Sequence, residues 1–102
     1  MPLFSVFCLD YPPHSMPKRD AVRAEHRAYV LSHDAPLRFV GVCTDSDGNQ
    51  CSSFYILEAA NEQEVRDWFA KEPFAATGVY EHLIVREFMV GLNRLEGHNW
   101  PG

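Results

Sequence analysis

The sequence predicts an α+β domain of the ferredoxin-like type, in which one antiparallel sheet carries two helices on one face. Two observations carry this prediction. The chain has 102 residues, 46% of them apolar, which suffices for one hydrophobic core but not for two. Its strand-like and helix-like segments follow each other in the order βαββαβ, which is the order of that fold. Residues 1–102 are therefore expected to form a single domain, with residues 91–102 as a C-terminal tail.

The first strand and the first helix are expected on either side of a proline-rich loop. Residues 3–9 are a short run of β-branched, aromatic and aliphatic types, which Asp10 and a pair of prolines close. Ser15 is a suitable helix cap, and Pro17 is tolerated in a first turn. Positions at helical spacing up to Pro36 then form one stripe, namely Val22, His26, Tyr29, Val30 and His33.

A β-hairpin is expected next. Residues 37–44 and residues 53–59 are both rich in apolar side chains. Between them, residues 45–49 read Asp-Ser-Asp-Gly-Asn, residue types that tolerate the positive φ angles of a tight turn. The two runs therefore predict a pair of antiparallel strands.

A second helix and a last strand complete the order. Asn61 and Glu64 have the spacing of a capping box, and Pro73 ends the helix that follows. The buried stripe of this helix is Val65, Trp68 and Phe69. Gly78 then marks a chain reversal, and residues 80–90 are a strand-like run with apolar positions on both faces.

Both faces of the predicted sheet carry apolar side chains. The two alternating sets are Val40, Val42, Tyr55 and Leu57 on one side, and Leu37, Phe39, Phe54 and Ile56 on the other. Helices cover only one face of such a sheet, and a second copy of the chain is the simplest cover for the other. We therefore predict a homodimer, with the tail and its Leu92, Leu95 and Trp100 packed across the interface.

Charge and cysteine content narrow the classes of partner. Fourteen acidic residues outnumber nine basic ones, and the net charge of −5 disfavours nucleic acids and anionic membranes. The N-terminal segment has no basic region, and its apolar run is too short for a membrane span. Cys8, Cys43 and Cys51 are odd in number and lack paired spacing, so we interpret them as buried thiols of a reducing compartment. We expect a cytoplasmic protein with neither a nucleic-acid nor a membrane partner.

His26 is the first candidate for chemistry. Arg19 and Arg23 precede it by two turns and by one turn, so the three side chains can line one edge of the helix. The imidazole could act as an acid or a base, and the guanidinium groups could bind a substrate carboxylate. A structural interpretation stays open, in which the histidine is bonded at the edge of the core and the arginines are solvated or salt-bridged.

Other chemical motifs are few. The remaining histidines stand singly without a metal-binding spacing, so no metal is predicted. The chain has no Gly-rich phosphate loop, nucleophile elbow or Cys-x-x-Cys. Phe74, Tyr80 and Phe88 could floor a pocket, although aromatic side chains in so small a domain mostly supply core volume.

Two stretches resemble the YCII-related family. They are residues 19–26, RDAVRAEH, and residues 72–81, EPFAATGVYE. The family pattern is an Arg-x-x-x-Arg-x-x-His helix, followed much later by an Asp-Pro-Phe segment that leads into Gly-Val-Tyr-Glu and the last strand. Spacing and element order match over nearly the whole chain. The sequence departs from the pattern at Glu72, which stands where the family has Asp.

The resemblance implies a dimeric α/β barrel with a pocket in each subunit near the helix-one histidine, which is His26. Related enzymes, among them a dehydrochlorinase and muconolactone isomerase-like proteins, are proposed to transfer protons on small cyclic substrates. They are proposed to use a His and Asp pair, without metal or cofactor. By this resemblance His26 would be the acid or base and Glu72 its carboxylate partner, with Asp10 as an alternative partner at the end of the first strand.

Four of the residues discussed above are the candidates for substrate binding. Arg19 or Arg23 would hold a substrate carboxylate, and Phe74 and Tyr80 would line the site. The predicted function is proton transfer of the isomerase or lyase type on a small cyclic anion. The alternative is a non-catalytic module that binds a small molecule in the same pocket.

Overall fold

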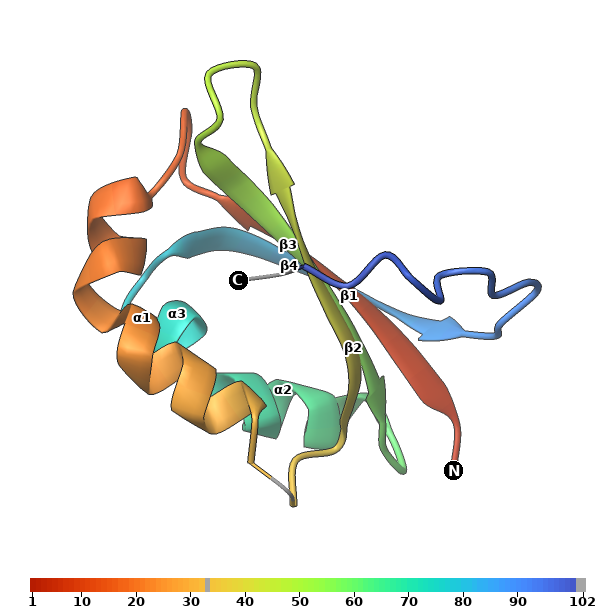
Figure 1. Cartoon of the computed structure of the whole chain (residues 1–102). Coiled ribbons are helices and arrows are strands. Elements are labelled where there is room, and N and C mark those ends of the chain that lie inside the picture. Colours follow the sequence, from red (N-terminus) through yellow and green to blue (C-terminus); the bar gives the residue numbers. More distant parts are fainter. Residues whose placement is uncertain (33, 101–102) are drawn as a thin grey trace.

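The computed structural model describes residues 1–32 and 34–100 and confirms the predicted ferredoxin-like fold (Figure 1). The elements are β1 (Leu3–Asp10), α1 (Met16–Val30), β2 (Leu37–Thr44), β3 (Gln50–Glu58), α2 (Glu62–Lys71), α3 (Pro73–Ala76) and β4 (Tyr80–Phe88). The strands pair antiparallel in the order β2-β3-β1-β4, and the helices lie together on one side of the sheet. His33, the last position of the predicted helical stripe, lies outside the described residues.

Local side-chain hydrogen bonds set the ends of several elements. Asn61 caps α2 as predicted, because its side chain accepts the backbone N–H of Glu64 at 3.0 Å. Ser15 stands at the start of α1 but does not cap it, since its hydroxyl donates to the carbonyl of Val79 at 2.8 Å. In the hairpin turn, one carboxylate oxygen of Asp45 accepts the N–H groups of Asp47 and Asn49, both at 2.9 Å.

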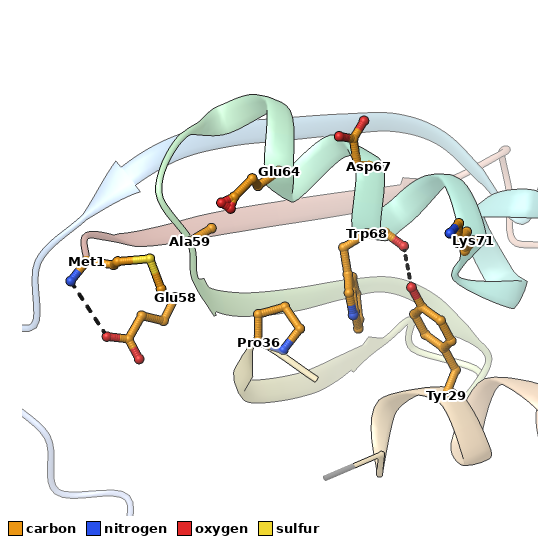
Figure 2. A pocket seen from close by; sticks show the side chains of 9 residues that line it. All are labelled: Met1, Tyr29, Pro36, Glu58, Ala59, Glu64, Asp67, Trp68 and Lys71. Atoms are coloured by element: carbon orange, nitrogen blue, oxygen red, sulfur yellow. Dashed lines mark hydrogen bonds and ion pairs between the residues drawn. The ribbon is translucent and has the colours of Figure 1, made fainter. Parts of the chain in front are cut away.

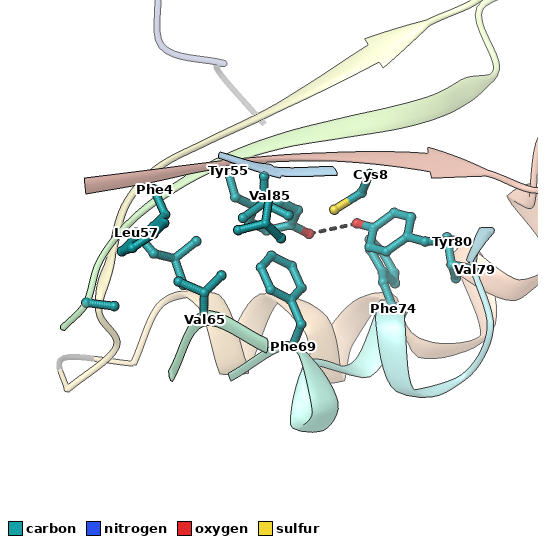
Figure 3. Close-up of a cluster of buried hydrophobic side chains, with 12 residues drawn as sticks. Phe4, Cys8, Tyr55, Leu57, Val65, Phe69, Phe74, Val79, Tyr80 and Val85 are labelled. Carbon is teal, nitrogen blue, oxygen red and sulfur yellow. Dashed lines mark hydrogen bonds between the residues drawn. The ribbon is translucent and has the colours of Figure 1, made fainter. Parts of the chain in front are cut away.

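The hydrophobic core fills the space between the sheet and the helices (Figure 3). Its members are Phe4, Val6, Cys8, Tyr55, Leu57, Ala59, Val65, Phe69, Phe74, Val79, Tyr80 and Val85. Of the three cysteines only Cys8 is buried, whereas Cys43 is exposed and Cys51 half-buried. The expectation of buried thiols is therefore wrong for the last two, because they lie at the end of the β2–β3 hairpin, outside this core.

Three buried groups that can lose a proton, one thiol and two phenols, make the stability of the fold depend on alkaline pH. Burial raises the pKa of the Cys8 thiol above its ordinary 9.0, and raises the pKa of the Tyr55 and Tyr80 phenols above 10.0. Above about pH 9 the unfolded chain therefore loses these protons while the folded chain keeps them, so stability falls with rising pH.

We expect the free energy of unfolding, measured by urea denaturation between pH 8 and pH 11, to fall by about 1.4 kcal/mol per pH unit for each group that ionises only on unfolding. Tyr80→Phe should make the fall less steep. Tyr11→Phe is the matched control, because Tyr11 is exposed. A stability that stays level over this range would contradict the prediction.

The opposite face of the sheet is also apolar, as predicted, but Leu37 does not belong to it. Leu37 pairs with the inward-facing Leu57 and packs against the core, because a bulge between Leu37 and Phe39 shifts the alternation of the strand. The large side chains of the opposite face are Leu3, Phe7, Leu9, Phe39, Phe54, Ile56, Ile84 and Phe88. We call this set the outer face. Phe54 is central, with ring centroids 6.2 Å from Phe7 and 6.1 Å from Phe39, and Ile84 is 42% exposed.

The segment after β4 partly covers one end of the outer face. Residues 89–100 form no helix or strand, and Val90, Leu92 and Leu95 line a hollow of about 230 Å³ together with outer-face residues. Leu92 and Trp100 remain 70% and 67% exposed. Within the described residues, no helix combines the length and the apolar character that a membrane crossing requires.

Candidate functional site

Glu72 lies at the junction of α2 and α3, and its side chain is completely buried. Pro73 disfavours a helical conformation at the residue before it, and Glu72 is extended, with φ −70° and ψ 124°. Its carboxylate turns back onto the start of α3, where it accepts the N–H of Phe74 at 3.1 Å and that of Ala75 at 2.9 Å. The backbone thus holds both oxygens of a buried carboxylate in place.

His26 meets this carboxylate from α1. Its Nδ1 is hydrogen-bonded to Oε1 of Glu72. The ring stacks on Phe74, with centroids 3.8 Å apart and planes inclined by 9°. The side chain is 13% exposed, and Nε2 makes no hydrogen bond with any described residue. The imidazole is therefore fixed on one edge and one face, and its second nitrogen is unengaged.

The hydrogen bonds of Glu72 also determine the tautomer of His26. Two backbone N–H groups already donate to the carboxylate, so Glu72 acts as an acceptor and Nδ1 as the donor. A neutral His26 then carries its hydrogen on Nδ1 and a lone pair on Nε2. This is the form in which an imidazole can take a proton.

Asp10 does not reach His26, because Arg19 binds it. Arg19 donates from Nε and Nη2 to the two carboxylate oxygens at 2.8 and 2.7 Å, and both side chains are 1% exposed. Burial lowers the pKa of the Arg19 guanidinium, but its hydrogen bond to Asp10 and neighbouring charges more than offset this, so the pKa is raised. Asp10 as partner of His26 and Arg19 as a substrate ligand are therefore corrected: the two neutralise each other inside the protein.

Arg23 remains accessible on the same side of α1. Its side chain is 32% exposed. Nη1 donates to Oε1 of Gln50 in β3 at 2.9 Å, and Nη2 donates to Asp20 at 2.8 Å. Of the two predicted arginines, Arg23 is the one that a ligand beside His26 could contact.

The three predicted pocket aromatics separate. Phe74 and Tyr80 are neighbours, with ring centroids 6.3 Å apart, and the Arg19 guanidinium lies 5.1 and 5.7 Å from their centroids. Phe88 belongs to the outer face, where it pairs with Leu3. The expectation that Phe88 joins the other two is wrong. Tyr80 and Phe88 are an even number of residues apart, which would place both on one face of a regular strand, but the irregular pairing next to Tyr80 shifts the alternation.

Sequence reasoning missed the polar groups that support these residues. Ser53 accepts hydrogen bonds from Arg19 and from the Tyr80 hydroxyl, each at 3.1 Å, and Gln50 holds Arg23. Ser53 alternates with Tyr55 and Leu57, which places it on the inward face, so the strand pattern contained a signal for it. Nothing in the sequence distinguishes Gln50.

A hollow of about 440 Å³ lies farther along α1 and α2, with Tyr29 and Trp68 on its wall (Figure 2). The Tyr29 hydroxyl donates to the carbonyl of Trp68 at 2.8 Å. His26 is not among the residues that line it. Among the described residues, no three metal-binding side chains gather at one point.

Comparison with known proteins places these features in context. A sequence profile of the YCII-related domain matches residues 3–89. An uncharacterised protein from Haemophilus influenzae is 29% identical over 93 residues, which cover 83% of this chain and 94% of that protein. The C-terminal domain of the MgtC protein from Mycobacterium tuberculosis has a TM-score of 0.51 at 15% identity, covering 86% of this chain and 88% of that domain, and shares the fold alone.

A solved enzyme structure is much more similar. It is the 5-chloro-2-hydroxyhydroquinone dehydrochlorinase (TftG) from Burkholderia phenoliruptrix AC1100, in complex with 2,5-dihydroxybenzoquinone. Its TM-score is 0.77 at 28% identity, and the match covers 87% of this chain and 95% of that one. Because the domain profile spans all the described strands and helices, from β1 to β4, the chain belongs to the YCII-related family.

Proposed function

We propose that the chain is a cofactor-independent enzyme in which His26 and Glu72 transfer a proton on a small cyclic substrate. The observation that carries the proposal is the imidazole held by Glu72 at Nδ1 and by Phe74 on its face, with Nε2 unengaged. The similarity to a dehydrochlorinase solved with a dihydroxybenzoquinone supports a hydroxylated, quinol-like ring as the substrate class.

The proposed step begins with Nε2 of His26 taking a proton from the substrate. Glu72 stabilises the imidazolium that forms, because its carboxylate faces the opposite edge of the ring. In an elimination, the electron pair left on the substrate forms a double bond while chloride departs with its own bonding pair. In an isomerisation, the same proton returns to another carbon. Either route balances without an external reactant.

Arg23 would position the substrate in this scheme. It is the accessible arginine one turn before His26, and guanidinium groups pair well with phenolate or carboxylate oxygens. Its partner Asp20 is 62% exposed, and such surface pairs are weak enough for a substrate anion to replace them.

The test compares wild-type, Glu72→Gln and Glu72→Asp chains on chlorinated hydroquinones and unsaturated lactones. Chloride release and ring absorbance are followed. A Gln side chain keeps the size of Glu but carries no charge, so it no longer stabilises the imidazolium, and we expect a rate loss of about tenfold or more. Glu72→Asp keeps the charge and a good helix cap, so it should retain more of the rate.

Nitrogen NMR of the His26 ring gives the second readout. Wild-type and Glu72→Asp chains should show the Nδ1–H tautomer. His82 is an internal reference, because its Nε2 faces Glu81 at 3.3 Å. Full activity in Glu72→Gln, or an Nε2–H tautomer in the wild type, would refute the proposed roles. Absence of turnover on every compound would favour the binding-module alternative.

We further propose that a second copy of the chain covers the outer face. Ile84 lies on this face in the edge strand β4, opposite Phe7 of β1, and is 42% exposed. A Glu at position 84 would place a charge in the apolar interface, so we expect Ile84→Glu to be monomeric at micromolar concentration in sedimentation velocity. Val40→Glu is the matched control, since Val40 is also 42% exposed but pairs with the inward-facing Tyr55. A dimeric Ile84→Glu chain, or a monomeric wild type, would contradict the proposal.

A further inference from the structure

Two cysteines lie together at the end of the β2–β3 hairpin. Cys43 is the next-to-last residue of β2, and Cys51 is the second residue of β3. Both are free, and the Sγ atom of Cys51 is 3.7 Å from the backbone carbonyl oxygen of Cys43. Neither belongs to the core or to the proposed proton-transfer site.

The strand register explains this approach. Cys43 pairs with Ser52, but the next residue, Thr44, pairs with Gln50, so Cys51 is the extra residue of a bulge. A bulge sets two residues against one on the opposite strand, and Cys51 therefore shares the partner of Ser52. Directly opposed residues have Cβ atoms about 4.5–5.5 Å apart, close to the about 3.5–4.5 Å of a disulfide.

We propose that Cys43 and Cys51 are a redox-responsive pair that closes into an intramolecular disulfide and moves the bulge. The oxidant would be a small disulfide such as oxidised glutathione. The two thiols form one S–S bond and give up two electrons and two protons, and the oxidant is reduced to two thiols. Attack by one cysteine gives a mixed disulfide, which the second cysteine resolves because it is already adjacent.

The bulge also connects the pair to Arg23. Gln50 directly precedes Cys51, and its Oε1 accepts the hydrogen bond from Nη1 of Arg23 at 2.9 Å. Drawing Cys51 toward Cys43 displaces its neighbour Gln50, and Arg23 then loses or changes this contact. The link concerns the hydrogen bond itself, so it stands or falls independently of the proposed enzymatic activity.

The first test is the mass of the folded, reduced chain after incubation with oxidised glutathione. We expect a loss of two hydrogen masses. Cleavage before Asp45 and Asp47 should leave the peptide with Cys43 joined to the peptide with Cys51 until a reductant is added. Cys8 should stay reduced, because it is buried and its pKa is raised. One glutathione retained on each of Cys43 and Cys51, or no reaction at either, would overturn the proposal.

The second test follows the Arg23 side chain by NMR. Its Nε–H signal should shift between the reduced and the oxidised wild-type chain. Cys43→Ser and Cys51→Ser are the matched controls, since neither can form the disulfide, and after treatment each should bind one glutathione instead. An Arg23 signal that stays in place in the disulfide form would refute the link through Gln50.

Discussion

Replacing His26 by alanine is expected to lower kcat/KM for proton transfer by about 10²- to 10⁴-fold, the usual contribution of a positioned acid or base. The imidazole supplies Nε2, and among the described residues no other side chain is hydrogen-bonded to Glu72. Glu72 keeps its hydrogen bonds to the N–H groups of Phe74 and Ala75, so the local backbone should survive the change. Initial rates of chloride release on a turned-over chlorohydroquinone measure the effect.

The control for this variant is His82→Ala. The His82 side chain is 62% exposed on β4, so its removal should leave the rate unchanged. Urea denaturation of both variants separates loss of chemistry from loss of fold. A drop of less than about tenfold for His26→Ala, or an equal drop for His82→Ala, would refute the role of His26 as the base.

Replacing Arg19 by methionine is expected to lower the free energy of unfolding by about 3–5 kcal/mol, the range for breaking a buried ion pair from one side. Asp10 is 1% exposed and would lose two hydrogen bonds, of 2.8 and 2.7 Å. The backbone N–H of Ser15 at 3.2 Å would be its remaining donor. Urea denaturation measures the loss.

Two further variants test the cause of this loss. Asp10→Asn combined with Arg19→Met removes both charges, and we expect it to be more stable than Arg19→Met alone. Arg38→Met breaks the surface pair with Glu58, whose partners are 51% and 34% exposed, and should cost less than about 1 kcal/mol. If Arg19→Met costs no more than Arg38→Met, the buried pair does not stabilise the fold as argued.

The element order could be predicted because each strand and longer helix carries its own hydrophobic period. The beginning of β3 could not, since Gln50 is polar and its pairing with Thr44 follows from backbone hydrogen bonds rather than from burial. Helix α3 has four residues, too few to show a period. Its available signal was Glu72 before Pro73, a carboxylate that can cap a helix beginning with proline.

The site was predictable in part. Helical spacing placed Arg19, Arg23 and His26 on one side of α1, and all three do point to partners outside the helix. The spacing could not tell which of them is buried, because the partner of Arg19 is Asp10, on a different element. The family resemblance named Glu72, but its contact with His26 spans 46 residues of chain, and only the packing of α1 on α3 creates it.

The attachment of Glu72 to the first N–H groups of α3 has a consequence for the length of this connection. The carboxylate is two and three residues away from the amides that hold it, and the stacked ring of Phe74 lies within the same stretch. One residue inserted or deleted between Glu72 and Ala75 would therefore move the Glu72 carboxylate away from the amides that hold it, and would also change its position relative to the ring of Phe74. Loops usually absorb changes in length, but this one should be the connection in which natural variants and engineered insertions are least tolerated.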